Sequence, residues 1–318
     1  MLNFVVLGTS EFTLCLAKNV IKNGCRVVAL VSMPKENRPN NSIDIGDFAT
    51  KQSIPYFEFE DINSPESKKI ITEIAPDFIL SSWPKIIDNS IISIPKRMVI
   101  GSHPAVLPYN RGRHPLHWHI ALGIKNTSIS FFNMDEGIDS GNILIQEPFS
   151  IEESDNINDA NNKMIGAASF GLSKLIEILK KDQSYIGKAQ DQAKISTWRE
   201  RDIFDVMIDF RMSIGMIKRL ISSFSYPYPC AKLIYKTDSI KISSFGCIKY
   251  NDKNIIRLMH GEILKIIDKS LFIKADDGVI ELISLFDLPN SIKEAKFINP
   301  PGKYLMEYRE ELMNKINK

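Results

Sequence analysis

Residues 4–32, FVVLGTSEFTLCLAKNVIKNGCRVVALVS, decide the fold. Phe4–Leu7 is a short, continuous apolar run that indicates a buried strand, and Gly8 ends it. Apolar residues at helical spacing follow up to Gly24, and Arg26–Ser32 is a second apolar run rich in β-branched residues. A strand, a helix and a second buried strand in this order predict two parallel strands joined by a crossover helix.

Strand and helix patterns continue to alternate up to about residue 205. Short apolar runs predict strands at residues 55–57, 78–81, 98–100, 128–132 and 143–146. Helical spacing predicts helices at residues 43–52, 65–74, 116–122 and 157–179. This alternation is typical of α/β proteins, so we predict a Rossmann-like, mostly parallel sheet with helices on both faces.

The pattern changes after residue 205. One helical run at residues 214–221 precedes short alternating runs at residues 231–235, 240–250, 261–267, 271–275 and 279–285. Short strands at this spacing are typical of a small β-barrel. We therefore predict a Rossmann-like domain at residues 1–205 and an OB-like β-barrel domain at residues 206–318, which ends in a charged helix from about Lys303.

Composition and charge narrow the possible functions. The formal net charge of +2 over 318 residues is too small to indicate a polyanion-binding surface, so we expect no nucleic-acid partner. No apolar run approaches the roughly 18–20 residues that cross a bilayer, and we expect no membrane association. Four cysteines are widely spaced, with no C-x-x-C pair, and the first residues lack a basic segment followed by a cleavable apolar one. We expect reduced thiols and a cytoplasmic protein.

The first strand–helix junction does not match a nicotinamide site. The sequence Gly8-Thr9-Ser10 departs from G-x-G-x-x-G, and no acidic residue ends the second strand where a ribose would need one. The helix start could still hold an anion through its free N–H groups. Ser10 could equally act as a simple helix cap.

Candidate catalytic residues lie between residues 101 and 141. His103 would lie just beyond the end of the strand at residues 98–100, and Asp139 lies in an acidic turn. A neutral imidazole can take up a proton near neutral pH, and a carboxylate beside it stabilises the imidazolium. Such a His–Asp pair would be catalytic, although a histidine after a strand can also serve as a structural hydrogen-bonding group.

A histidine cluster in the same stretch invites a metal interpretation. His114, His117 and His119 are close in sequence, and imidazole suits zinc. On a helix, however, His119 would point away from the other two, and no cysteine or carboxylate stands at a matching spacing. We therefore expect no metal.

Two long motifs resemble those of the folate-dependent formyltransferases. Residues 103–112, HPAVLPYNRG, are similar to the family pattern H-P-S-L-L-P-x-x-R-G, and residues 135–141, DEGIDSG, are similar to D-E-G-x-D-x-G. Residues 196–201, 208–210 and 227–231 also resemble the W-R-x-R, I-D-W and P-Y-P-G-A elements that join the family's transferase domain to its C-terminal barrel. The resemblance covers nearly the whole chain.

This resemblance implies transfer of a formyl group from 10-formyltetrahydrofolate to a primary amine without a metal. His103 would accept the proton from the attacking amine, and Asp139 would orient the imidazole and help to relay the proton. The residues expected to bind the folate are Ser81, Ser82, Trp83, Pro84, Asp135, Gly137 and Ile138. The residues expected to bind the acceptor substrate are Ser10, Tyr109, Asn110 and Arg111.

One position departs from the family pattern. The family has an asparagine two residues before the histidine, and this chain has Gly101 there. That asparagine donates a hydrogen bond to the developing oxyanion, a contribution worth about 2.7–4 kcal/mol. A backbone N–H, a water molecule or Ser102 must replace it, or else the enzyme is slow or the protein only binds its ligands.

Two acceptors are found within the family, initiator methionyl-tRNA and nucleotide-linked amino sugars. The loop at residues 34–41 holds only Lys35 and Arg38 as cations, which disfavours tRNA. The sequence at residues 111–115 and the W-R-x-R element look more like the sugar-nucleotide members. We therefore predict a sugar N-formyltransferase for surface polysaccharide (O-antigen) synthesis, with dTDP-4-amino-4,6-dideoxyglucose as the best candidate. A methionyl-tRNA formyltransferase and a catalytically impaired folate- or nucleotide-sugar-binding relative are the alternatives. Dimers are common in the family, which leaves a homodimer open.

Overall fold

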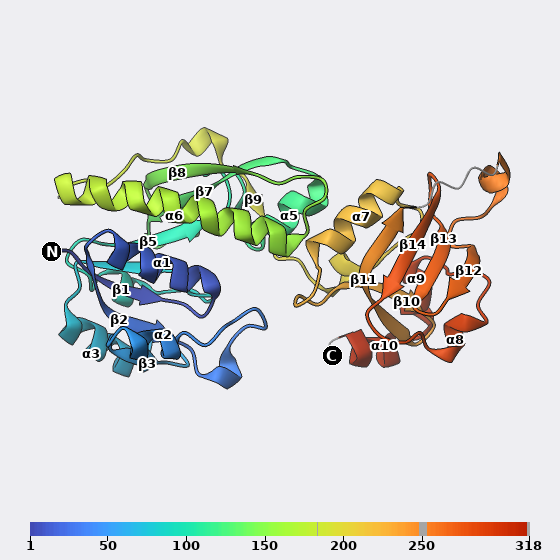
Figure 1. The fold of residues 1–318 in the computed structure, drawn as a ribbon, viewed down its shortest axis with the longest axis horizontal. Helices are drawn as coiled ribbons and strands as arrows, with labels where there is room; N and C mark the ends of the chain where they lie inside the picture. Colours follow the sequence, from blue (N-terminus) through green and yellow to red (C-terminus); the bar gives the residue numbers. More distant parts are fainter. Residues whose placement is uncertain (183, 248–252, 317–318) are drawn as a thin grey trace. The chain divides into compact units, whose positions relative to one another are not determined.

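The chain forms two compact units. The computed structural model describes residues 1–182, 184–247 and 253–316 (Figure 1). The first unit consists of residues 1–115, 126–151 and 160–199, and the second consists of residues 116–125, 152–159 and 200 onward. The predicted boundary near residue 205 stays a prediction.

A seven-stranded sheet in the order β3-β2-β1-β4-β5-β7-β8 forms the centre of the first unit (Figure 1). Its strands are β1 (Asn3–Leu7), β2 (Arg26–Ser32), β3 (Tyr56–Glu58), β4 (Phe78–Ser81), β5 (Met98–His103), β7 (Asn126–Asn133) and β8 (Ile143–Ser150). The first five strands are parallel, and β7 pairs antiparallel with both β5 and β8. The predicted mostly parallel sheet is therefore confirmed, with an antiparallel edge.

Helices cover both faces of this sheet, as predicted. They are α1 (Glu11–Lys22), α2 (Gly46–Lys51), α3 (Pro65–Ile74), α4 (Asn89–Ile92) and α6 (Ile157–Lys181). Ile71 of α3 and Ile91 of α4 are buried in one apolar cluster with Val5 of β1, on one face of the sheet. Helices α1 and α6 form the layer on the other face. There, Asn19 Nδ2 of α1 donates a hydrogen bond to Ser169 Oγ of α6 at 2.7 Å, so the two helices lie side by side. The central strands are consequently buried on both faces and read as continuous apolar runs.

The carboxyl ends of β1, β4 and β5 lie next to one another at one edge of the sheet. Leu7 pairs with Ser81, and Ser81 pairs with Gly101. At the end of β1 the chain turns sharply at Gly8, where φ is +150° and an added Cβ would lie 2.2 Å from Ser82 Oγ. Only glycine fits this turn. The loops that follow these three strands therefore lie together at the carboxyl edge of the sheet, where ligands bind in open α/β sheets.

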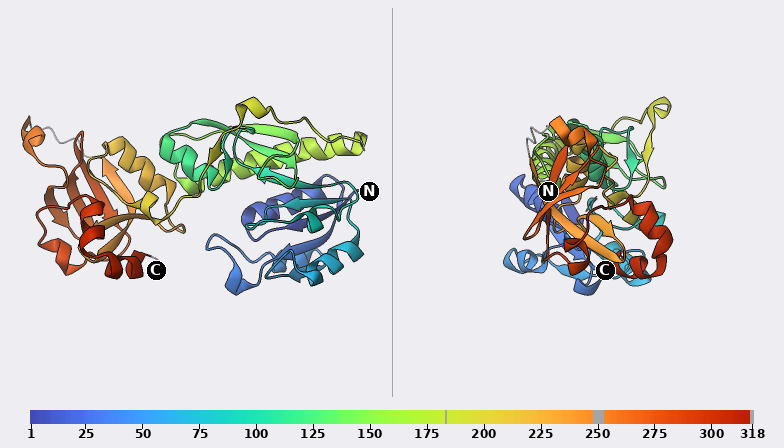
Figure 2. Two further views of the ribbon diagram at one scale, coloured as in Figure 1. Left: turned by 180° about the vertical axis from the view of Figure 1, so that it is seen from behind. Right: turned by 90° about the vertical axis from the view of Figure 1, so that its right-hand side faces the viewer.

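The second unit contains a five-stranded antiparallel sheet, consistent with the predicted small barrel domain (Figure 2). Its strands, in spatial order, are β10 (Ala231–Tyr235), β11 (Asp238–Cys247), β14 (Val279–Ser284), β13 (Ser270–Lys274) and β12 (Ile263–Ile267). The last three residues of the strand predicted at 240–250 lie outside the described residues. Its helices are α5 (Pro115–Leu122), α7 (Ile214–Ser223), α8 (Asn290–Lys293), α9 (Pro301–Glu307) and α10 (Arg309–Ile316).

The predicted single C-terminal helix is wrong in one respect. The chain leaves the helical conformation at Tyr308, with φ −131° and ψ 34°, so α9 and α10 are separate helices. Tyr304 of α9 and Leu312 of α10 are both buried in the apolar core of the second unit. Tyr308, at the break between the two helices, also packs against this core.

Smaller elements complete the fold. A two-stranded parallel pair joins β6 (Arg111–Gly112) to β9 (Thr197–Trp198). Short 3-10 helices lie at Lys35–Asn37, Gln192–Lys194, Ile203–Val206 and Lys253–Arg257. Within the described ranges, no helix is long and apolar enough to span a membrane.

Candidate active site

His103 and Asp139, which are distant in sequence, lie side by side. His103 Nδ1 is 3.3 Å from Asp139 Oδ2, and His103 Nε2 is 2.7 Å from the backbone oxygen of Asn110. Only 5% of the histidine side chain and 18% of the aspartate side chain are exposed. The carboxylate and the imidazole therefore face each other largely away from solvent. A neutral imidazole has one N–H, so only the imidazolium can donate to both oxygen atoms at once.

The predicted place of His103 beyond the strand end is wrong. β5 continues through His103, whose backbone pairs with Ser130 of β7. The antiparallel partner extends β5 past the apolar run from which the strand was predicted. His103 is therefore fixed on a rigid strand, which suits a group that must hold a proton at a defined position.

The Gly112 N–H and the Gln190 side chain hold Asp139 in place. Its φ is +50°, in the left-handed region that aspartate tolerates better than most residues. Its Oδ2 accepts a hydrogen bond from the Gly112 N–H at 3.0 Å, and its carbonyl oxygen accepts one from Gln190 Nε2 at 2.8 Å. The aspartate side chain and its backbone are thus fixed by separate partners.

The residues expected to bind folate lie in two segments near this pair. Ser81 ends β4 next to Gly101, and Ser82 Oγ donates to the Leu7 carbonyl at 3.0 Å. Trp83 is 9% exposed and belongs to the apolar core, and its indole nitrogen has no partner among the described residues. Pro84 follows it, half-buried. The edge position of this segment fits the prediction, and its contact with folate stays a prediction.

The second folate segment is the acidic turn that carries Asp139. Asp135 Oδ1 accepts hydrogen bonds from the Gly137 N–H at 3.1 Å and from Ser140 Oγ at 2.5 Å. Ile138 is 68% exposed. An exposed apolar side chain next to Asp139 is available to cover a flat ring system.

The residues expected to bind the acceptor differ in accessibility. Tyr109 is 43% exposed, and Ser10 is a half-buried residue that precedes α1. The Asn110 N–H donates to Ser196 Oγ at 2.9 Å. Arg111 is only 8% exposed, and its Nη2 donates to Gln190 Oε1 at 2.7 Å. Arg111 therefore supports the site from within, and its predicted contact with a substrate phosphate stays a prediction.

Ser102 is poorly placed to replace the family asparagine. Side chains alternate along a strand, so Gly101 and His103 share one face of β5 and Ser102 lies on the other. Ser102 pairs with Phe131, whose ring lies 3.7 Å from the Cβ position of Gly171 on α6. A Cβ on Gly101 would instead lie 2.7 Å from Phe132 Cζ and 2.9 Å from Met134 Cγ. Two large side chains thus occupy the space of the family asparagine.

We expect Gly101→Asn to destabilise the protein and to leave turnover no higher. The new side chain overpacks a buried position beside Phe132, which typically costs about 1–3 kcal/mol. Thermal unfolding measures the loss, with Gly302→Asn as the matched control, because nothing lies within 4 Å of a Cβ at Gly302. A stable Gly101→Asn variant with faster formyl transfer would show that the site still accommodates the asparagine.

The hydrogen bonds by which the segment from Gln190 to Ser196 holds the candidate site in place were not predicted from the sequence. Residues 182–196 are polar and rich in turn-forming residues, which is typical of a surface loop, yet Gln190 is 6% exposed and bonded to both Asp139 and Arg111. Ser196 accepts from the Asn110 N–H, and its carbonyl oxygen accepts from the Arg111 N–H at 2.9 Å. Polar residues carry no periodic signal when their partners are distant in sequence, so no spacing pattern could have identified Gln190.

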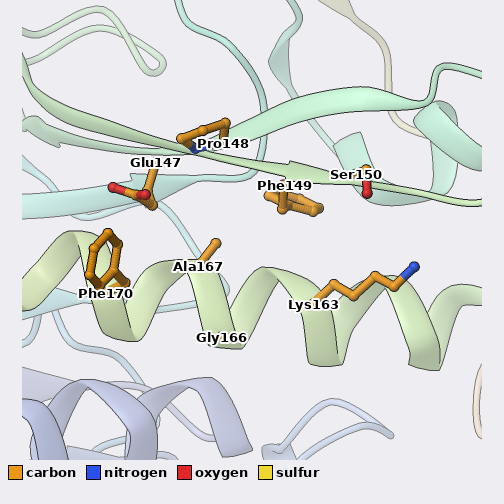
Figure 3. A pocket seen from close by; sticks show the side chains of 8 residues that line it. All are labelled: Glu147, Pro148, Phe149, Ser150, Lys163, Gly166, Ala167 and Phe170. Carbon is orange, nitrogen blue, oxygen red and sulfur yellow. The ribbon is translucent and has the colours of Figure 1, made fainter.

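A surface groove elsewhere in the first unit is not this site. It has a volume of about 440 Å³ and lies between β8 and α6, with Phe149 and Phe170 on its walls (Figure 3). None of the predicted site residues lines it. Glu147 at its rim is paired with Lys174 at 3.0 Å. Among the described residues, no group of three or more His, Cys, Asp or Glu side chains is placed to hold a metal ion.

Comparisons with known proteins identify the family. The formyl transferase model matches residues 2–176, and the model of the formyl transferase C-terminal domain matches residues 204–299. A methionyl-tRNA formyltransferase of Thermodesulfovibrio yellowstonii is 26% identical over 98% of this chain and 96% of its own length. These matches define a formyl-transferring enzyme with a two-part architecture.

Two solved structures share the fold. The N-formyltransferase from Helicobacter canadensis, in complex with folinic acid and dTDP-3-aminofucose, has a TM-score of 0.66 and 16% identity, and the match covers 91% of this chain and 100% of that one. A variant of HypX from Aquifex aeolicus has a TM-score of 0.66 and 13% identity over 93% of this chain, which spans about half of the HypX length. The chain belongs to the formyl transferase family, the folate-dependent formyltransferases that its motifs resemble.

Proposed function

We propose that this enzyme transfers the formyl group of 10-formyltetrahydrofolate to the amino group of a nucleotide-linked aminodeoxy sugar. The amine nitrogen attacks the formyl carbon, and the bond from that carbon to N10 of the folate breaks. For this step His103 Nε2, which faces the Asn110 carbonyl oxygen in the structure, exchanges that contact for the amine and accepts the proton that the amine loses. Asp139 stabilises the imidazolium from Nδ1. The proton then passes to N10, so that the products are the formamide and tetrahydrofolate.

The observation that supports a small acceptor is the burial and pairing of Arg38. Its side chain is 10% exposed, and its Nη2 lies 2.6 Å from Glu58 Oε1. The same guanidinium donates to the Met33 carbonyl at 2.7 Å and to the Tyr56 hydroxyl at 3.1 Å. Burial, together with the hydrogen bond to Glu58, raises the pKa of Tyr56 to about 12, so this residue stays an uncharged partner.

Because the Arg38 guanidinium is buried and paired with Glu58, it is poorly placed to contact a nucleic-acid phosphate. Affinity for a polyanion depends on cations that can replace its counterions. The loop at residues 34–41 then keeps Lys35 as its one cation without a carboxylate partner among the described residues. This supports a small acceptor over a tRNA. By analogy with the ligands of the Helicobacter canadensis relative, a dTDP-linked amino sugar is the class we propose, with dTDP-4-amino-4,6-dideoxyglucose as first candidate.

Methionyl-tRNA is the second candidate acceptor, favoured by two observations. Residues 206–318 hold 18 lysine and arginine residues against 13 aspartate and glutamate residues, so the positive charge is concentrated in the C-terminal part. The relative from Thermodesulfovibrio yellowstonii, which matches over nearly its whole length, is a methionyl-tRNA formyltransferase. A basic C-terminal domain could contact tRNA phosphates without the loop at residues 34–41.

A panel of acceptors separates these candidates. We expect release of tetrahydrofolate from 10-formyltetrahydrofolate with a dTDP-linked aminodeoxyhexose and none with methionyl-tRNA. The matched blank is the His103→Asn variant with each acceptor. Turnover with methionyl-tRNA alone would contradict the proposed acceptor and leave the His–Asp pair in its role. Silence with every acceptor, while folate still binds, would favour a catalytically impaired relative.

A further inference from the structure

Gln190 lies at the centre of the contacts behind the His–Asp pair. Its side-chain amide is fully engaged: Nε2 donates to the carbonyl oxygens of Asp139 at 2.8 Å and Gly141 at 2.7 Å. Its Oε1 accepts from Arg111 Nε at 3.2 Å and Nη2 at 2.7 Å. The residue is 6% exposed, so these bonds form away from water and have strict geometric demands.

The two sides of this amide lead to the two groups that contact His103. On one side, Nε2 fixes the backbone of Asp139, whose carboxylate faces His103 Nδ1. On the other, Oε1 fixes Arg111, which directly follows Asn110, and the Asn110 carbonyl faces His103 Nε2. One buried side chain therefore connects both oxygen partners of the imidazole.

A second set of hydrogen bonds connects the same segments of the chain. Gly112, the residue after Arg111, donates its N–H to Asp139 Oδ2. The pairing of β6 with β9 places residues 111–112 against residues 197–198, a few residues after Gln190 in the chain. The segment from Gln190 to Trp198 thus binds the loop that follows His103 and the turn that carries Asp139.

We propose that Gln190 is a positioning residue, which holds the Asp139 carboxylate against Nδ1 of His103. This role rests on the proposed formyl transfer at His103. It assigns no contact between Gln190 and a substrate. Its basis is that Asp139 has a left-handed backbone, with φ +50°, which needs support from its surroundings to persist.

Glutamate at position 190 gives the sharpest test. A carboxylate can still accept from Arg111, but it cannot donate to the carbonyl oxygens of Asp139 and Gly141 and would repel them. Gln190→Glu therefore keeps the buried guanidinium paired and removes only the support of the aspartate. Gln190→Leu removes both functions and leaves Arg111 without its acceptor.

Two readouts distinguish positioning from simple stability. With the acceptor that the wild-type enzyme uses, we expect Gln190→Glu to lower kcat about 10- to 100-fold with little change in KM, because small misplacements of a catalytic group slow the chemistry. Independently of any substrate, the downfield N–H proton of the His103 imidazole, identified by its loss in His103→Asn, should broaden or shift in Gln190→Glu. Gln52 is the matched control, since it is exposed and follows α2, outside this segment, and Gln52→Glu should alter neither readout.

Each result decides the inference. A Gln190→Glu variant with wild-type kcat and an unchanged His103 N–H resonance would overturn it. Loss of turnover with an unchanged resonance would also overturn it, because the effect would then bypass the His–Asp pair. If the wild-type enzyme formylates no acceptor in the panel, the proposed function fails, and the resonance still reports whether Gln190 holds the pair.

Discussion

Replacing His103 with asparagine is expected to lower kcat for formyl transfer by about 10²- to 10⁴-fold, the usual contribution of a general acid–base group. Asparagine can form a hydrogen bond to Asp139, but it cannot take up the proton that the amine loses. Because His103 is 4% exposed and lies on β5, no neighbouring solvent can readily take its place. Release of tetrahydrofolate, measured with the acceptor that the wild-type enzyme uses, gives the effect.

The chain offers a matched control for this substitution. His260 Nε2 lies 3.4 Å from Asp276 Oδ1, but this second His–Asp pair is largely exposed and belongs to the second unit. His260→Asn should leave kcat unchanged. Folate binding, followed by calorimetry, should persist in both variants. If His103→Asn retained the wild-type rate, the proton would have to leave by another route, and His103 would lose its assigned role.

The fold could be predicted well from the sequence because its strands are buried on both faces. The apolar runs at residues 4–7 and 26–32 correspond closely to β1 and β2, since a strand between two helical layers must be apolar throughout. Strand ends were less predictable. β5 runs to His103 because β7 pairs with it, and pairing between residues distant in sequence leaves no local signal.

The candidate site could be predicted only in part. The motifs of a known family led to His103 and Asp139, and the structure places them 3.3 Å apart. Gln190 could not be found in this way, because its partners lie 51 and 79 residues away in sequence and its polar neighbours suggested a surface loop. Pattern reasoning detects groups that repeat or that match a motif. A buried amide satisfied by distant backbone carbonyls does neither.

Gly141, the last glycine of the acidic turn, has no room for a side chain, so its replacement should strongly destabilise the protein. A Cβ on Gly141 would lie 1.6 Å from the Asn133 carbonyl oxygen and 2.8 Å from its carbonyl carbon. Both are backbone atoms of β7, next to the point where the Asn133 N–H donates to the Asn142 carbonyl at 2.9 Å. No side-chain rotation can relieve this clash. We expect Gly141→Ala to lower the free energy of unfolding by about 3 kcal/mol or more, the upper end for overpacking a buried position.

Gly166→Ala is the matched control for this stability prediction, and its effect should have the opposite sign. Gly166 lies in the exposed part of α6 with nothing within 4 Å of its Cβ position, so alanine there should stabilise the helix by about 0.5–1 kcal/mol. Urea denaturation of both variants measures the two changes. Equal stabilities would contradict the tight approach of Gly141 to β7. The Gly141 carbonyl oxygen accepts from Gln190, and Gly141 stands two residues after Asp139. We therefore also expect Gly141→Ala to reduce kcat, since the backbone shift that relieves the clash must move Asp139, the proposed partner of His103.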